Sequence, residues 1–312
     1  MNYKMKMLMR KLFYGGPTKN IYEHLSQRKT ISRENMSDEE YIRLKFSENV
    51  GGVLNLECPQ TLTDKLNWLK LHCKRPEFTQ MVDKYEVKKY VSEKIGEQYV
   101  VPLYGVWNHF DEIDFDELPD SFVLKVTHNS GGLVICKDKS QFDKNTARQK
   151  LEDALKINYY TLSREYPYKD VKPRIIAEKY IPNLGNEDSV EYKLSCFNGK
   201  VKFTTVCKGL AHDSYDVRTN DHYDRDGNIL PFYVLYKNAN PPIPLPRQID
   251  EMIRIAEILA EGIPYVRVDL YVNNEQVLFG EMTFFTWGGF IQFTPKEWDR
   301  TMGDWLTLPK EG

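Results

Sequence analysis

The sequence has no excess of charge of either sign: 43 lysines and arginines stand against 45 acidic residues, a formal net charge of −2. This balance gives no general basic field, so we predict no nucleic-acid partner. Cysteine is scarce, and the five present (Cys58, Cys73, Cys136, Cys196 and Cys207) form no CxxC pair or zinc-like spacing. An odd number leaves one thiol over from any pairing, which favours a reducing, cytoplasmic setting. The sequence also lacks an apolar run long enough to span a bilayer and a signal peptide with an apolar core.

The N-terminal segment, residues 1–50, is basic at its start and predicted to be helical. Residues 1–14 mix lysine and arginine with methionine, leucine and phenylalanine, and Gly15-Gly16-Pro17 ends any helix there. We expect this helix to pack on its own protein. The alternative is a peripheral contact with the inner, anionic face of a membrane.

Two neighbouring strands carry charge where their surroundings are apolar. Residues 265–271 contain Arg267 and Asp269, and residues 279–289 contain Glu281 and Thr283. Side chains of a strand alternate between faces, so the members of each pair share a face. Buried carboxylates need cationic partners, and oxygen ligands suit Mg²⁺ bound to the phosphates of a nucleotide. The pattern predicts a nucleotide-dependent enzyme, whereas a hairpin with an exposed charged face is the structural alternative.

The register of this hairpin decides whether a metal site can form. A two-residue turn at Asn273-Asn274 would place Asp269 and Glu281 on opposite faces of the sheet. A three-residue loop over 273–275 would set Arg267 opposite Glu281, with Asp269 one diagonal away on the same face. The metal hypothesis therefore requires an odd loop or a bulge.

Lys125 interrupts an apolar strand and is followed by His128-Asn129-Ser130-Gly131-Gly132. Glycines let backbone N–H groups approach phosphate oxygens, and a lysine adds a point charge. No Walker phosphate loop is present. A hairpin turn beside a surface lysine is the commoner origin of such a pattern.

The remaining local signals predict regular elements. Helices are expected at 61–72, from 83 to near Gly96, and at 249–260, where apolar residues recur every three or four positions. A strand is expected at 174–181. Asn198-Gly199 predicts a tight hairpin turn between two further strands.

The order of these features resembles the ATP-grasp superfamily, and within it the TupA-like (teichuronopeptide biosynthesis) branch, whose members are often labelled glycosyltransferases. The resemblance runs from about Leu66 to Pro309. It implies that Lys84 and Lys125 contact nucleotide phosphate, that the 128–132 loop covers it, and that Glu191 holds the ribose, with Asp188 as a rival. The implied cofactor-binding set is Lys84, Lys125, His128, Ser130, Gly131, Glu178, Lys179, Tyr180, Ile181, Glu191 and Lys193. Within it, 178–181 would be the adenine hinge.

The resemblance also implies a catalytic role for Arg267, with Lys125, and Mg²⁺ ligands in Asp269, Glu281 and Thr283. Threonine stands where the superfamily has asparagine, as in the TupA-like branch. Trp287 and Phe290, which directly flank Gly288-Gly289, would either bind a sugar or belong to the core, and the core is favoured.

The expected fold class is α+β: an ATP-grasp fold of two α+β lobes clasping ATP, preceded by a helical and α/β portion. The expected boundaries are 1–50, 51–118 before the fold, 119–181 for the small lobe and 182–312 for the large lobe with the metal site. The implied activity is ATP-dependent carboxylate–amine ligation through an acylphosphate. The partners would be an amine and a carboxylate or glycan acceptor, such as a uronic-acid-containing cell-surface polysaccharide or its precursor. A sugar or polyol kinase and a glycosyltransferase are the alternatives, although no DxD motif supports the latter.

Overall fold

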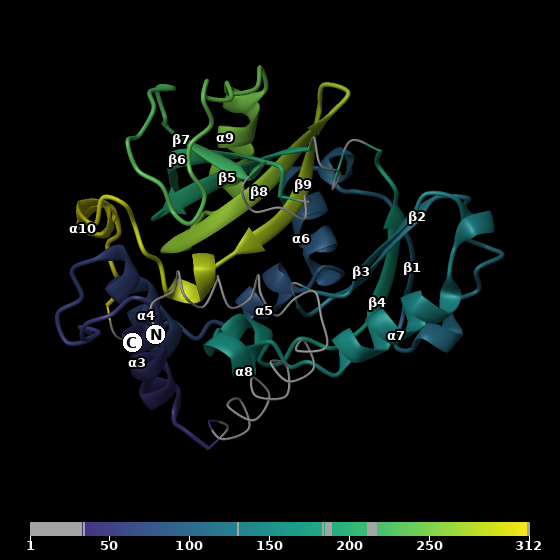
Figure 1. Ribbon diagram of the computed structural model, residues 1–312, viewed down its shortest axis with the longest axis horizontal. Helices are drawn as coiled ribbons and strands as arrows, with labels where there is room; N and C mark the ends of the chain where they lie inside the picture. Colours follow the sequence, from purple (N-terminus) through teal and green to yellow (C-terminus); the bar gives the residue numbers. More distant parts are fainter. Residues whose placement is uncertain are drawn as a thin grey trace.

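Two antiparallel sheets lie at opposite sides of the computed structural model, and helices pack between and around them (Figure 1). The structure describes residues 33, 35–129, 131–182, 184, 189–210 and 217–310. The strands are β1 (Leu103–Trp107), β2 (Phe122–Val126), β3 (Leu133–Cys136), β4 (Ile175–Lys179), β5 (Val190–Phe197), β6 (Lys200–Lys208), β7 (Thr219–Asp224), β8 (Tyr265–Asn273) and β9 (Gln276–Thr283). The longer helices are α3 (Asp38–Asn49), α4 (Leu62–His72), α5 (Glu77–Val82), α6 (Glu86–Ile95), α7 (Lys144–Leu155), α9 (Ile249–Leu259) and α10 (Glu297–Trp305). Two short turns of helix, α8 (Tyr160–Ser163) and η4 (Tyr166–Tyr168), follow α7.

The small sheet has the strand order β1-β4-β2-β3. Its inner face packs on α7 around a core of its own, in which Phe122, Leu124 and Leu151 are fully buried. Strand β1 is an edge strand of this sheet, although the predicted boundaries assign its residues to the preceding portion. The domain boundaries themselves stay predictions.

The large sheet has the order β7-β6-β5-β8-β9. Side chains along its strands alternate between the two faces, and one face presents Leu194, Cys196 and Val268 to α9. Because this apolar face is buried against α9, the alternate side chains of the same strands lie on the other, polar face. The predicted turn at Asn198-Gly199 is confirmed: both residues have positive φ (48° and 78°), as the tight turn between β5 and β6 requires.

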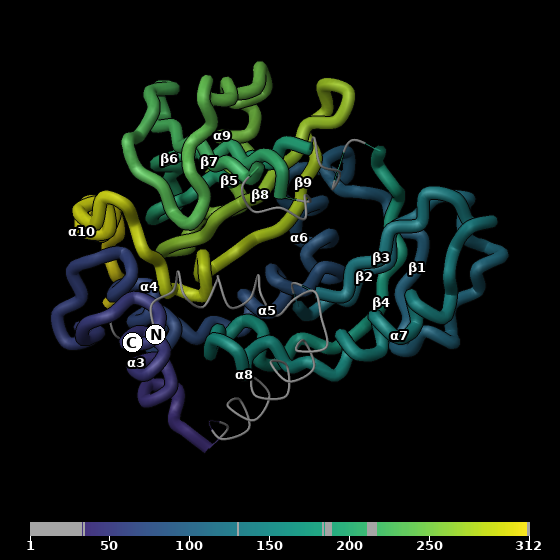
Figure 2. Tube along the Cα trace, viewed as in Figure 1, coloured from purple at the N-terminus to yellow at the C-terminus, as the bar shows by residue number. Residues whose placement is uncertain are grey.

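The N-terminal helices α3 to α6 share one hydrophobic core with the large sheet. The predicted helix at 61–72 is confirmed as α4, and its first turn has a capping box between Thr61 and Asp64. The tube in Figure 2 follows the chain from α7 to α8, below α5, and η4 contacts α5. This segment therefore brings residues 163–168 from the small lobe back to the large one. Within the described residues, no helix has the length and apolar character needed to cross a membrane.

Candidate active site

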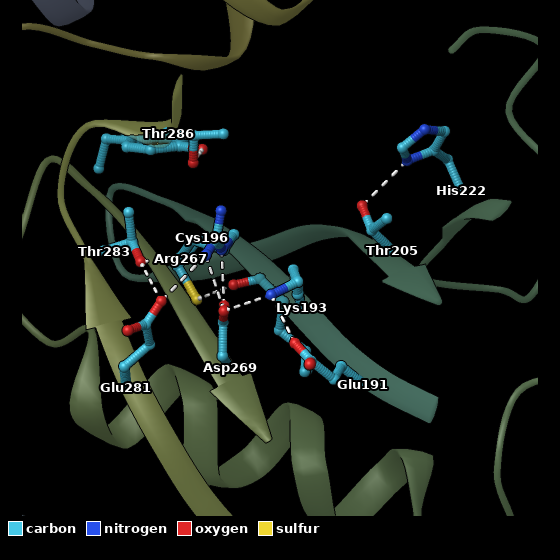
Figure 3. A network of polar contacts seen from close by, with 12 residues as sticks. Glu191, Lys193, Cys196, Thr205, His222, Arg267, Asp269, Glu281, Thr283 and Thr286 are labelled. Carbon is cyan, nitrogen blue, oxygen red and sulfur yellow. Dashed lines mark hydrogen bonds and ion pairs between the residues drawn. The ribbon is translucent and has the colours of Figure 1, made fainter. Parts of the chain in front are cut away.

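A row of polar side chains crosses all five strands of the large sheet. The strand register pairs each member with the next, and directly paired residues share a face of the sheet. From β9 to β7 the row consists of Glu281, Asp269, Lys193, Thr205 and His222. Figure 3 shows the charged residues gathered at one end and Thr205 with His222 at the other. Neighbouring strands lie about 4.8 Å apart, so the row spans roughly 19 Å.

A bulge at Gly280 brings the predicted charged residues together. Of the two arrangements that the metal hypothesis allows, an odd loop and a bulge, the loop is not the one formed: the turn has two residues, Asn274 and Glu275, with φ of 47° and 67°. This turn alone would leave Asp269 and Glu281 on different faces, but the register shifts by one between Asp269 and Leu270. Asp269 consequently lies directly opposite Glu281, and Arg267 opposite Thr283 rather than opposite Glu281. The expectation of an odd loop or a bulge is confirmed by the bulge.

Glycine is required at this bulge. A Cβ on Gly280 would lie 2.6 Å from Cε2 of Tyr271 and 3.0 Å from the carbonyl oxygen of Asp269. A larger residue would force the Tyr271 ring and the facing backbone of Asp269 to move, which disturbs the bulge. The local sequence therefore controls which face carries Glu281.

Asp269 is the centre of the charged cluster. The residue is 1% exposed, and its carboxylate accepts hydrogen bonds from Arg267 (2.6 and 2.7 Å) and from Nζ of Lys193 (2.8 Å). Lys193 also donates to Glu191 at 2.8 Å. Burial alone would raise the pKa of Asp269, but Arg267 and Lys193 together hold it below its ordinary value. Asp269 is thus an anion with both oxygens engaged.

Glu281 is held more loosely. Its side chain is 45% exposed, and the nearest guanidinium nitrogen of Arg267 is 3.4 Å from Oε1. Oγ1 of Thr283 donates to the same carboxylate at 3.3 Å and accepts from Arg267 at 3.1 Å. The three predicted metal ligands therefore lie together.

The donor set of this cluster fits a metal bound jointly with phosphates. No group of three or more histidine, cysteine, aspartate or glutamate side chains in the described part of the chain could hold an ion by itself. Mg²⁺ commonly binds through one or two carboxylates together with substrate phosphates. Glu281, with Asp269 behind it and Thr283 beside it, can supply such a partial set.

The small sheet contributes a second charged cluster around Glu178. This buried carboxylate on β4 lies 2.6 Å from Nζ of Lys125 and 2.6 Å from Nζ of Lys88. Burial alone would raise its pKa, but the two lysines hold it below the ordinary value. Its side chain thus orients Lys125 and is itself fully engaged. Sequence reasoning missed Lys88, whose position on α6 gives no local signal.

The rest of the predicted hinge follows Glu178 out of β4. Lys179 is exposed, Tyr180 is half-buried and Ile181 is buried. The amide of Lys179 donates to the carbonyl of Pro102 at 2.9 Å. These residues lead from the small sheet toward β5, where a nucleotide between the lobes would meet them. Asp188, the rival ribose contact, lies outside the described residues.

Hydrogen bonds of the Asn129 side chain hold the predicted phosphate loop against the end of α7. Nδ2 of Asn129 donates to the carbonyl of Ala154, at 2.9 Å, and its Oδ1 accepts from the amide of Gly131 at 2.7 Å. His128 is buried with its ring against the carbonyl of Ile157, so only its backbone is placed to meet a nucleotide. Ser130 lies outside the described residues.

Lys84 connects this loop to the large sheet. Its Nζ donates to the carbonyl of Asn129 at 2.7 Å. Burial lowers the pKa of Lys84, and the negative charge of Glu281 opposes this shift. The predicted residues Lys84, Arg267, Glu281 and Thr283 accordingly line one cavity.

That cavity has a volume of about 1000 Å³ and runs along the polar face of the large sheet. Trp287 lines it and is 42% exposed, so the favoured assignment of Trp287 to the core is wrong. The chain is left-handed from Trp287 to Gly289, which turns the indole outward. Phe290 is half-buried and does pack against the core. Sequence reasoning also missed Glu165, which lines the cavity from a segment remote in the chain.

Comparisons with known proteins agree with this architecture. A model of the TupA-like ATP-grasp family matches residues 64–307, and the chain belongs to this family. The expected ATP-grasp fold of two α+β lobes is thereby confirmed. The ATP-grasp family uses ATP with a divalent metal ion. No match was found among curated proteins.

Similar solved structures include several ligases. A D-alanine–D-alanine ligase from Bacillus anthracis, complexed with ATP, is 18% identical, with a TM-score of 0.39 over 65% of this chain and 55% of that one. An L-amino acid ligase from Bacillus licheniformis is 15% identical, with a TM-score of 0.41 over 79% and 55% of the two chains. The matched part of this chain thus spans about half the length of these proteins.

Proposed function

We propose that this protein is an ATP-dependent carboxylate–amine ligase. It would join an amino acid to a uronic-acid-containing cell-surface polysaccharide, or to a precursor of one, through an acylphosphate. The observation that carries the proposal is the convergence of Arg267, Glu281 and Thr283 in a large cavity that Lys84 also lines, with Asp269 paired directly to Glu281 and buried behind it. Family membership supports the use of ATP, and the acceptor class follows from the resemblance to the TupA-like branch.

The residues of this site divide the work between binding and charge stabilisation. Lys84 and Lys125 are placed to bind phosphate oxygens, and Glu178 keeps Lys125 in position. Bound Mg²⁺, held by Glu281, Asp269 and Thr283, would supply neutralisation of phosphate charge. Arg267 is fixed by Asp269 and would stabilise the negative charge that develops on the transferred phosphoryl group.

The size of the cavity supports an extended acceptor. It continues from Arg267 along β5 to β7, where Thr205 and His222 lie, and past the exposed ring of Trp287. Aromatic faces and neutral polar groups suit a sugar better than a simple amino acid. Tyr236 also lines the cavity, and its ring centroid lies 6.3 Å from the ring centroid of Trp287.

The test is the identity of the products. The protein is incubated with Mg²⁺, ATP, D-glucuronate and a mixture of the twenty amino acids, and the products are measured by mass spectrometry. A ligase gives ADP, phosphate and a new amide, and it gives them only when acid and amine are both present. ADP with a phosphoester and no need for amine would instead establish a kinase. Turnover of a nucleotide sugar without ATP would overturn the proposal.

A further inference from the structure

Glu165 is a buried carboxylate that the reaction described above leaves unused. It lies between α8 and η4, is 3% exposed and lines the large cavity. Among the described residues, the hydroxyl of Ser163 is its hydrogen-bond donor, at 2.6 Å to Oε1. Glu281 is the other acidic side chain of the cavity lining. A second carboxylate therefore faces the acceptor space from outside the sheet.

The buried Lys70 forms no direct contact with the Glu165 carboxylate among the interactions of the described residues. Nζ of Lys70 donates to the carbonyl oxygen of Ser163 at 3.0 Å and to that of Gly288, and it lies 4.2 Å from the centre of the Phe290 ring. No described residue forms an ion pair with Glu165. Lys70 thus ties the backbone of residue 163 to the 286–289 loop. Its charge favours the ionised form of Glu165, and the hydrogen bond from Ser163 engages Oε1 alone.

Aromatic residues line the same cavity as this carboxylate. Tyr159 and Tyr168 line the cavity with their ring centres 4.7 Å apart, and Phe290 and Trp287 line it from the opposite loop. A carboxylate together with aromatic rings can bind an ammonium group, because ion pairing and cation–π attraction add together. A substrate carboxylate, by contrast, is drawn to the end that holds Arg267 and Lys84. The charges of the cavity therefore orient two different substrates.

We propose that Glu165 and Tyr168 form the subsite for the amine substrate, which binds there as an ammonium ion and transfers a proton to the Glu165 carboxylate. This inference rests on the proposed ligase function. Loss of that proton gives a neutral amine with a free electron pair. The nitrogen then attacks the acyl carbon, the C–N bond forms, and the C–O bond to phosphate breaks. The leaving phosphate takes the bond's electron pair and the second N–H proton, so an amide and hydrogen phosphate result.

The electrostatics of Glu165 agree with a proton acceptor. Burial raises its pKa, Lys70 and Ser163 oppose this, and Glu281 adds to it. A carboxylate with a raised pKa is a stronger base than an exposed one and can still bind an ammonium ion.

Hydroxylamine separates the amine step from the activation of the carboxylate. It is neutral near pH 7 and so needs no ammonium subsite or base, yet it traps an acylphosphate as a hydroxamate. With D-glucuronate as the acid, we expect Glu165→Gln to form hydroxamate as the wild type does. With the amino acid mixture as the amine source, its amide formation should fall by at least about 100-fold. Glu77→Gln, an exposed carboxylate outside the cavity, serves as the matched control and should change neither rate.

Each outcome decides the proposal. Normal amide formation by Glu165→Gln overturns it, as does a parallel loss of hydroxamate in a variant that still gains melting temperature with ATP. Absence of hydroxamate from the wild-type protein overturns the ligase function and this inference with it. If Glu165→Gln does not fold, Glu165→Asp carries the test: it keeps the charge but shortens the side chain, so amide formation should fall while hydroxamate formation is retained.

Discussion

Glu281 and Asp269 are directly paired across β9 and β8. The structure nevertheless predicts that removing the charge of Glu281 has little effect on stability, whereas removing that of Asp269 is strongly destabilising. Glu281 is 45% exposed, and its contact with Arg267 is long, at 3.4 Å. Arg267 keeps both bonds to Asp269 when Glu281 loses its charge. We expect Glu281→Gln to change the free energy of unfolding by no more than about 1 kcal/mol, the usual range for an exposed ion pair.

Activity should respond in the opposite way. If Glu281 binds Mg²⁺ against the phosphates, the amide weakens that interaction in the transition state. We expect ATP-dependent turnover to fall by at least about 100-fold, or roughly 2.7 kcal/mol in the activation barrier. Asp269→Asn also removes activity, but it leaves Arg267 and Lys193 without their buried anion. That loss should destabilise the fold by about 3–5 kcal/mol.

The assay is denaturant unfolding and turnover measured on both variants. Glu275→Gln, at the exposed turn of the same hairpin, is the matched control and should alter neither quantity. The reasoning fails if Glu281→Gln unfolds easily but retains near-normal specific activity, since Glu281 would then be a structural partner of Arg267 and not a metal ligand. It fails equally if Asp269→Asn is as stable as the wild type.

ATP with Mg²⁺ should raise the melting temperature, because a ligand that binds only the folded state stabilises it; a shift with a uridine diphosphate sugar and none with ATP would contradict this. Gly280→Ala should lower stability by about 1–3 kcal/mol and abolish turnover, because its Cβ meets Tyr271 and disturbs the bulge; Gly262→Ala has open space around its Cβ but a φ of 72°, so it should lower stability by about 1–2 kcal/mol and still retain activity. The pKa of Glu178 is lowered on folding, so its ion pairs contribute stability above the unfolded-state pKa of about 4.3, and this contribution is lost as pH falls through the lower folded-state value. The difference in unfolding free energy between the wild type and Glu178→Gln should accordingly shrink on going from about pH 7 to about pH 3, and an equal difference at both would refute the assignment.

Features decided by neighbouring residues could be predicted from the sequence. The Asn198-Gly199 turn follows from two residues that tolerate positive φ, and the capped start of α4 follows from Thr61 and Asp64. The alternation along β8 likewise places Arg267 and Asp269 on one face. These signals are local and need no knowledge of the partner strand.

Features decided by contacts between remote elements could not be predicted. The register of β9 depends on the approach of Gly280 to Tyr271, and the two-residue turn at 274–275 by itself suggests the wrong face. Lys88 becomes a partner of Glu178 only when α6 packs beside β4. Glu165 reaches the cavity because Lys70 binds the backbone of residue 163, more than ninety positions along the chain.

The two sides of the site carry charge excesses of opposite sign, which a nucleotide and a metal ion bound together would neutralise. On the small-lobe side Lys84, Lys88 and Lys125 stand against one carboxylate, Glu178, which leaves an excess of positive charge suited to phosphate. On the large-lobe side Arg267 and Lys193 stand against Asp269, Glu191 and Glu281, an excess of negative charge suited to a divalent cation. A nucleotide alone would bring its phosphates close to Glu281, and a metal ion alone would find only part of a ligand set. Nucleotide and metal bound together satisfy both excesses, so their binding should be mutually dependent.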